Sequence, residues 1–335
     1  MTTPRAIDTA CDISPAEFKA LVASSSEPLL IKGLVAEWPA VRCAQNGQDA
    51  VDHYIRQFYA GAGVGLFTGE PGISGRFFYD DSLTGFNFER SIEKLDKVLD
   101  LIREHADAAD PPSFYVGSTT VDTCLPGFRT ENDLDFGDVS PLASIWIGNC
   151  SRISAHYDVP DNVACVVAGH RRFTLFPPEQ LENLYVGPVD LTPAGQQISL
   201  VDFKQPDFER FPRFRQALDQ ALIADLAPGD ALLIPSMWWH HVESFDSLNI
   251  LVNYWWSRSP EFAGPPVDVL YHALLSLKCL PPEQKKAWQA MFDYYIFGEE
   301  PDIGHIPEQG RGVLGALDET SARKLRALLL KRLNR

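Results

Sequence analysis

The spacing of apolar positions changes along the chain. Between about residues 141 and 258, short apolar and β-branched runs alternate with turn signals, as in SIWIG, RISAHYD, NVACVVAG and RRFTLFPP. This rhythm is typical of an antiparallel sandwich or small barrel. The residues before this stretch mix helical and strand patterns, and helical patterns return after Pro260. The pattern therefore predicts a mainly β protein with flanking helices.

Local signals place elements on both sides of the predicted β core. Ser14, Pro15 and Glu17 form a helix start with a capping serine, an early proline and a reciprocal glutamate. Before the core we expect helices over 14–24 and 91–105 and strands over 28–32 and 113–117. After it we expect helices over Val267–Leu280, Pro282–Phe297 and Asp318–Leu333.

These elements predict one domain over residues 1–258 and a helical region over 259–335. The domain would combine mixed α/β elements over 1–140 with the β core over 141–258. The helical region either caps the β core or forms a homodimer interface. The spacing of its apolar residues does not decide between these alternatives.

Composition narrows the class of protein. The chain has 335 residues, 45% hydrophobic and 22% charged, which is ordinary for a globular protein. Its net charge of −16 argues against nucleic acid or an anionic membrane surface as a partner. Apolar runs are too short to span a bilayer, and the N-terminal residues lack the apolar segment of a secretory signal. The six cysteines contain no CxxC pair and indicate reduced core thiols of a cytoplasmic protein.

The strongest candidate for chemistry is His156-Tyr157-Asp158 together with His240 or His241. Residues i and i+2 of a strand point to the same face, so His156 and Asp158 can hold one metal ion. Two histidines and one carboxylate form the facial triad of non-haem Fe(II) oxygenases. Consecutive residues of a strand point to opposite faces, so only one of His240 and His241 can complete the triad. The spacing alone is weak, since it recurs at His105-Ala106-Asp107 and His241-Val242-Glu243.

Several motifs in one order strengthen this interpretation. The segment HYDVPDNVACVVAGHRRFTLFPPEQLENLYVGPV, followed by VDF, PDFERFP, PGD, IPSMWWHHVES and VNYWW, resembles the cupin-like JmjC oxygenases. Among these, the asparaginyl hydroxylases are most similar. The resemblance implies a double-stranded β-helix of jelly-roll type that binds Fe(II) and 2-oxoglutarate. It also implies hydroxylation of an unidentified substrate, with a protein side chain favoured over a small molecule.

The resemblance also assigns roles to individual residues. The metal ligands fall on His156, Asp158 and His240, and His241 would then be a supporting or structural residue. The 2-oxoglutarate carboxylate would be held by Arg171, where the relatives usually have lysine, with Arg172 as the competing candidate.

Four further residues match positions around the co-substrate or the iron. Asn162 and Asn253 match asparagines at the co-substrate end of the pocket. Tyr115 matches a tyrosine that reaches the distal carboxylate, and Trp255 matches a tryptophan near the iron. Ile153 stands where the relatives often have a hydroxyl residue. This departure, together with Arg171, keeps open a metal-binding cupin with different chemistry or a non-catalytic binding module.

Overall fold

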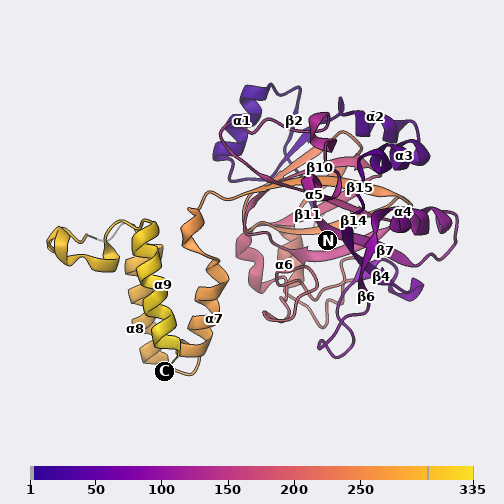
Figure 1. Cartoon of the computed structure of the whole chain (residues 1–335). Helices are drawn as coiled ribbons and strands as arrows, with labels where there is room; N and C mark the ends of the chain where they lie inside the picture. The colour runs from indigo at the N-terminus through magenta and orange to yellow at the C-terminus, as the bar shows by residue number, and fades with distance from the viewer. Residues whose placement is uncertain (1–3, 300–301, 335) are drawn as a thin grey trace. The chain divides into compact units, whose positions relative to one another are not determined.

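The computed structural model describes residues 4–299 and 302–334 and separates into two compact units, Met1–Arg258 and Ser259–Arg335 (Figure 1). Residues 1–3, 300–301 and 335, which belong to the two predicted ranges, lie outside the described part. The strands that carry the candidate site all belong to the first unit.

Two sheets form the centre of the first unit. The smaller sheet has the order β1 (Arg5–Ala6), β12 (Leu222–Leu226), β11 (Arg171–Phe176), β14 (Trp239–Ser244), β9 (Ser151–His156) and β5 (Arg76–Phe77). The larger sheet has the order β2 (Thr9–Cys11), β3 (Leu29–Lys32), β13 (Ala231–Ile234), β10 (Asp161–Ala168), β15 (Asn249–Trp256), β8 (Leu142–Gly148), β7 (Ser113–Thr120), β4 (Gly63–Gly69) and β6 (Glu89–Lys94).

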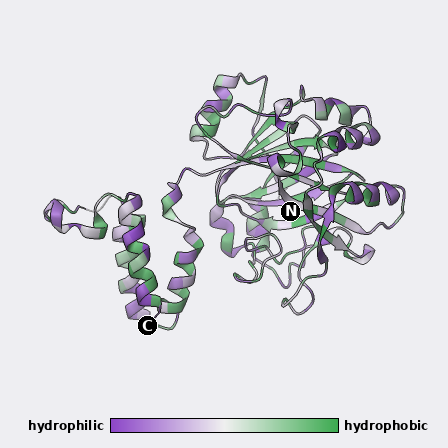
Figure 2. Ribbon diagram, in the orientation of Figure 1, coloured by the Kyte–Doolittle hydropathy of each residue, from purple (hydrophilic) through white to green (hydrophobic). Residues whose placement is uncertain are grey.

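The strands β8 to β15 form the predicted jelly roll. Along the chain, β8, β10, β13 and β15 enter the larger sheet, and β9, β11, β12 and β14 enter the smaller one. Apolar side chains from both sheets pack between them, including Val166, Leu175 and Leu232. In Figure 2 the strands are largely green, as expected for a sheet that is covered on both faces. The prediction of a mainly β, jelly-roll fold with flanking helices is confirmed.

Short helices surround the sheets of the first unit. They are α1 (Pro15–Ser24), α2 (Pro39–Gln45), α3 (Gln48–Phe58), α4 (Leu95–Glu104), α5 (Val121–Cys124) and α6 (Phe214–Asp219), with 3-10 turns at Pro71–Ile73, Phe128–Thr130 and Pro178–Glu182. The predicted start of α1 is confirmed, because Ser14 and Glu17 form a complete capping box. Residues of α1, α2, α3 and α4 join a core on the outer face of the larger sheet.

The predicted helix over 91–105 begins four residues too early. Residues 91–94 belong to β6, which pairs antiparallel with β4. Ile92 has helical spacing to Leu95, but its side chain is 76% exposed and lies outside the buried stripe. That stripe consists of Leu95, Val98, Leu99 and Ile102. Strand pairing with a partner distant in sequence therefore overrides the local helical spacing.

The second unit is helical in its described residues. It contains α7 (Pro266–Leu277), α8 (Pro282–Phe292) and α9 (Glu319–Leu333), a π-helical turn at Asp293–Phe297, and 3-10 turns at Glu261–Ala263, Glu308–Gly310 and Gly312–Leu314. The predicted α-helix over Pro282–Phe297 is therefore correct only to Phe292. Within the described ranges, no helix is long and apolar enough to cross a membrane.

The six cysteines are free thiols with different environments. Cys124 and Cys165 are buried and Cys43 is half-buried, as expected for core thiols. Cys11, Cys150 and Cys279 are exposed, so the prediction of core positions is wrong for these three. The first lies on an edge strand and the last follows α7, where sequence spacing gives no signal of burial.

Candidate functional site

Strands β9 and β14 bring two histidines of the candidate triad together. His156, the last residue of β9, pairs directly with His240 near the start of β14. Beyond this pair the register shifts, so that Ser154 and Ala155 oppose the single residue His241. Such a bulge re-aims side chains at the end of a strand. It leaves Ile153, Ser154 and His156 all lining one cavity.

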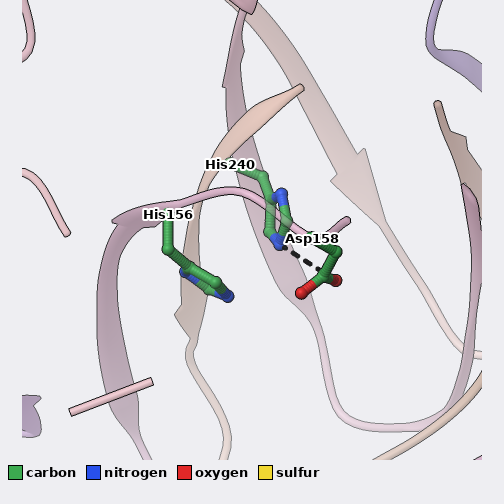
Figure 3. A group of neighbouring side chains, drawn as sticks. All are labelled: His156, Asp158 and His240. Carbon is green, nitrogen blue, oxygen red and sulfur yellow. Dashed lines mark ion pairs between the residues drawn. The ribbon is translucent and has the colours of Figure 1, made fainter. Parts of the chain in front are cut away.

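The third residue, Asp158, completes a compact cluster. Potential ligand atoms of His156, Asp158 and His240 lie within 4.8 Å of one another. Figure 3 shows the ring of His156 turned toward the other two side chains. The distance from His240 Nε2 to Asp158 Oδ2 is 3.7 Å. Burial and the adjacent His156 lower the pKa of His240, so the ring is neutral and this contact is not an ion pair at neutral pH. A metal ligand requires this neutral form.

Backbone carbonyls fix the orientation of both imidazoles. His156 Nδ1 lies 2.9 Å from the carbonyl of Ser154, and His240 Nδ1 lies 3.0 Å from the carbonyl of Trp238. A neutral ring that donates from Nδ1 leaves the Nε2 lone pair free. Hydrogen bonding of the other ring nitrogen is the usual support of a metal-binding histidine.

Asp158 reaches the cluster by a route that differs from the sequence argument. Strand β9 ends at His156, so the two-residue strand period does not position Asp158. Instead, Met237 N–H donates to the Asp158 carbonyl at 2.9 Å, and Ser236 binds the adjacent loop at the carbonyl of Val159. These bonds tie the loop after β9 to the turn before β14.

A chain of side-chain hydrogen bonds orients the Asp158 carboxylate. Its Oδ2 accepts from Trp255 Nε1 at 3.1 Å and from Asn162 Nδ2 at 3.2 Å. Asn253 donates to the Asn162 oxygen at 3.2 Å and accepts from Trp146 at 2.7 Å. The two predicted asparagines therefore support the carboxylate through a relay that begins at Trp146.

The cluster lies in the wall of a cavity of about 400 Å³, which is within the usual size range of small-molecule sites. The eight residues to which the resemblance assigned a ligand or co-substrate role all line this cavity: Tyr115, His156, Asp158, Asn162, Arg171, His240, Asn253 and Trp255. The structure thus gathers residues from β7, β9, β10, β11, β14 and β15 around one space.

Arg171 is the buried cation of the cavity. It is 4% exposed, and its Nε has no hydrogen-bond partner. Burial lowers its pKa to about 10, although nearby Tyr115 acts in the opposite direction. Burial also raises the pKa of Tyr115, which therefore stays protonated. An unpartnered buried guanidinium is costly unless an anion joins it.

The competing residues face elsewhere. Arg172 forms two hydrogen bonds of 2.7 and 2.9 Å with the carboxylate of Asp225 and is half exposed. The His241 ring packs against Phe203 at 4.4 Å, and neither of its nitrogens has a partner. Burial, with smaller contributions from Arg152 and Arg76, lowers the pKa of His241 to about 3.

Among the cavity residues that sequence reasoning does not predict, Trp146 and Arg90 have polar groups directed at the site. In the sequence, Trp146 is part of the apolar run SIWIG, and Arg90 lies one residue before a predicted helix. Trp146 begins the hydrogen-bond relay, and Arg90 lines the cavity from β6. Period-two alternation on β8 gave a signal for Trp146. The position of Arg90 depends on long-range strand pairing, which leaves no local signal.

A double-stranded β-helix with two histidines and a carboxylate in the wall of its cavity defines a cupin with a candidate metal centre. Residues 15–262 match the family described as the cupin-like domain. The chain therefore belongs to the cupin-like domain family, and its relatives include JmjC-type proteins. These relatives belong to the Fe(II)/2-oxoglutarate oxygenase type.

Three proteins that are similar to this chain in sequence carry names that refer to different functions. Lysine-specific demethylase JMJ31 of Arabidopsis thaliana is 36% identical over 127 residues, 37% of this chain and 23% of that protein. Human HSPB1-associated protein 1 is 32% identical over 152 residues, 44% of this chain and 30% of that protein. Mouse tRNA wybutosine-synthesizing protein 5 is 30% identical over 161 residues, 44% of this chain and 45% of that protein. Each match spans less than half of the relative.

Proposed function

We propose that this protein is an Fe(II)- and 2-oxoglutarate-dependent dioxygenase that hydroxylates an unidentified substrate. One observation carries the proposal. Two free imidazole nitrogens and a carboxylate converge on the cavity that also holds the buried, unpartnered guanidinium of Arg171. The first group suits an octahedral metal ion with open positions, and the second suits the far carboxylate of a dicarboxylic co-substrate.

The chain's own residues would hold both groups. His156, Asp158 and His240 would ligate Fe(II), while Arg171, aided by the Tyr115 hydroxyl, would bind 2-oxoglutarate. When bound, these groups supply the oxidation of a C–H bond with O2 as oxidant. The protein contributes orientation, because carbonyls fix the two imidazoles and the relay from Trp146 fixes the carboxylate. Aromatic side chains, among them Phe67, Phe77 and Trp146, line the cavity around the site.

For the substrate, only a broad chemical class is proposed. The names of the relatives refer to lysine demethylation, to association with HSPB1 and to a tRNA modification, so they do not agree on one substrate. The resemblance to protein hydroxylases favours a protein side chain, with a small molecule as the alternative. The net charge of −16 disfavours nucleic acid. The free cysteines favour a reducing, cytoplasmic location.

The test begins with protein purified without oxygen. Fe(II) is added, 2-oxoglutarate binding is measured, and succinate is followed after O2 is admitted. We expect 2-oxoglutarate binding and slow succinate formation, both dependent on Fe(II). The His156→Ala variant should lose succinate formation, while His241→Leu, a change on the opposite face, should retain it. Equal succinate formation by His156→Ala would overturn the site assignment.

The alternative is a metal-binding cupin with different chemistry, or a binding module that retains the ligands. Two residues favour it, because Arg171 replaces the usual lysine and Ile153 replaces a hydroxyl residue on the cavity wall. Metal binding with no affinity for 2-oxoglutarate would support this alternative over the dioxygenase.

We also propose that the second unit joins two copies of this chain. Ala322 is the one residue that is buried among its described residues. An apolar groove of about 890 Å³ runs between α7 and α8 and includes Leu270, Leu274, Trp288 and Phe292. A helical unit without its own buried core needs a further apolar surface, and an isologous pair of such grooves supplies one.

A further inference from the structure

Arg90 occupies an unusual position beside the candidate metal cavity. It lies on the edge strand β6 and lines the cavity, and its side chain is exposed. Its guanidinium carbon lies 4.5 Å from the ring centre of Phe86, 5.0 Å from that of Phe67 and 5.4 Å from that of Phe88. The guanidinium packs against these aromatic rings in cation–π contacts, which restrict the rotamers of Arg90.

One side of the guanidinium holds a loop of the cavity wall. Arg90 Nη2 donates to the carbonyl of Pro193 at 3.3 Å. Residues 192–195 around this carbonyl also line the cavity and contribute no charged side chain. Because a guanidinium has five N–H donors, the bond to Pro193 leaves most of them available.

The charges of the cavity are otherwise committed. The other ionisable side chains of its wall are His156, Asp158, Arg171 and His240, together with the protonated Tyr115. Our proposed function assigns the first four to Fe(II) and 2-oxoglutarate. Within residues 4–299 and 302–334, no acidic side chain forms an ion pair with Arg90. Arg90 is thus a cation at the cavity wall with neither an internal counter-charge nor a role in co-substrate binding.

We propose that Arg90 determines specificity by binding a carboxylate of the prime substrate, a carboxylate carried next to an apolar group. This inference rests on the proposed function, because it takes Arg171 as the site of 2-oxoglutarate. The free N–H donors can bind a carboxylate in the bidentate geometry that arginine favours. The aromatic side chains around the cavity, which include Phe67, Phe77 and Trp146, suit the apolar part of the same substrate.

The negative net charge of the protein means that binding of an anionic substrate depends on a local cation such as Arg90. A net charge of −16 repels an anionic substrate at long range. Selection of a carboxylate therefore needs a local cation, and Arg90 supplies it. If Arg90 served only to hold the loop at Pro193, its replacement would affect acidic and neutral ligands alike. The two roles can therefore be distinguished by comparing ligands that differ only in charge.

The experiment uses 3-phenylpropionate and its neutral amide, 3-phenylpropionamide, as probes. The full-length protein is saturated with Fe(II) and 2-oxoglutarate without oxygen, and each probe is titrated calorimetrically. We expect the acid to bind about fivefold to tenfold more tightly than the amide, as a charge-assisted but exposed contact allows. Arg90→Gln should remove this preference and leave the affinity for the amide unchanged.

Arg215→Gln is the matched control. Arg215 is also exposed and lies 3.9 Å above an aromatic ring, that of Phe208, but it does not line this cavity. Its replacement should preserve the preference for the acid. Three results would overturn the role of Arg90: equal affinities of the native protein for both probes, no binding of the acid, or a preference retained by Arg90→Gln.

Failure of the proposed function would be visible separately. Binding of 2-oxoglutarate is measured in the same protein before either probe is added, so its absence contradicts the proposed function alone. The probes are then compared without co-substrate in native protein, Arg90→Gln and Arg171→Gln. A preference lost only in Arg171→Gln would assign the acid to that site and overturn the role of Arg90.

Discussion

His240 and His241 are consecutive residues of β14, yet their rings lie on opposite faces of the sheet. His240 faces Asp158 with 3.7 Å between Nε2 and Oδ2, while His241 packs on Phe203 with ring centres 4.4 Å apart. Both rings are almost fully buried. The alternation of a strand therefore separates a candidate ligand from a ring whose two nitrogens have no partner.

This separation predicts different effects on metal binding. His240→Ala should reduce the affinity for Mn(II), used as an air-stable substitute for Fe(II), by more than about 100-fold because one of three ligands is lost. His241→Leu should leave the affinity unchanged. Calorimetric titration of both variants checks the prediction, and loss of Mn(II) binding in His241→Leu alone would contradict it.

The Trp255 indole should affect the metal affinity of the same site through its hydrogen bond to Asp158. Trp255→Phe keeps an aromatic ring but removes the N–H that donates to Asp158. We expect the affinity for Mn(II) to fall about tenfold, as is typical when support of a ligand is lost. The matched control is Trp256→Phe, because the neighbouring Trp256 Nε1 is buried without a partner. Equal losses in both variants would indicate a packing effect instead.

Replacement of Arg171 should separate co-substrate binding from metal binding. Arg171→Gln should weaken 2-oxoglutarate binding about 10-fold to 100-fold, since a charge-assisted contact is lost in a buried place. Mn(II) affinity should persist. Arg172→Gln, whose side chain pairs with Asp225 on the other face of β11, should retain both. A larger loss of 2-oxoglutarate affinity in Arg172→Gln would reverse the assignment.

Local alternation and turn signals were sufficient for an antiparallel sandwich or barrel, and the family resemblance added the jelly-roll topology. The resemblance also narrowed the triad, since His156 and Asp158 fall within one motif of the family and His240 within a second. The hydrogen bonds that bring these three residues together could not be predicted from the sequence. Asp158 lies beyond the end of β9, and bonds to Met237 and to the indole of Trp255 determine its place. Such bonds join segments about 80 to 100 residues apart, and local pattern does not encode them.

The same limit explains the errors around β6. Helical spacing at Ile92 competes with antiparallel pairing to β4, and the pairing prevails. Because β6 begins at Glu89, Arg90 lies within this edge strand, beside the cavity. A helix that begins at residue 91 does not by itself predict a position near the metal cluster for Arg90. The error in one element boundary therefore concealed a candidate substrate contact.

Asp202 should stabilise the strand that carries His156. Its carboxylate lies 3.0 Å from Arg152 of β9 and 3.4 Å from Arg76 of β5. Burial opposes its charge, but the Lys204 N–H and the two arginines outweigh burial and lower its pKa below 3.8. Asp202→Asn should reduce the free energy of unfolding at pH 7 by about 1 kcal/mol, a modest value because the group is partly exposed.

The pH dependence of this effect has a defined sign. A carboxyl whose pKa is lower in the folded state contributes stability above its unfolded pKa, and this contribution is lost as the pH falls through the folded pKa. The difference between native protein and Asp202→Asn should therefore begin to shrink near pH 3.8, the ordinary pKa, and vanish at lower pH, below the folded pKa. Urea unfolding at several pH values measures it. Asp225→Asn, which breaks a more exposed pair, should have a smaller effect, and a constant difference for Asp202→Asn would contradict the argument.

The apolar groove of the second unit predicts a dimer that one charge can disrupt. Leu274 lines the groove and is 38% exposed, so a second copy that covers the groove would bury it. Leu274→Glu would then place a carboxylate in an apolar interface, where its desolvation is costly. Light scattering should give twice the chain mass for the native protein and the monomer mass for Leu274→Glu. Gln284→Glu adds the same charge on α8 outside the groove and should remain dimeric.

A monomeric native protein would refute the dimer. If Leu274→Glu stays dimeric, the two copies associate through another surface. Retention of Mn(II) affinity by the monomeric variant would show that the first unit remains folded.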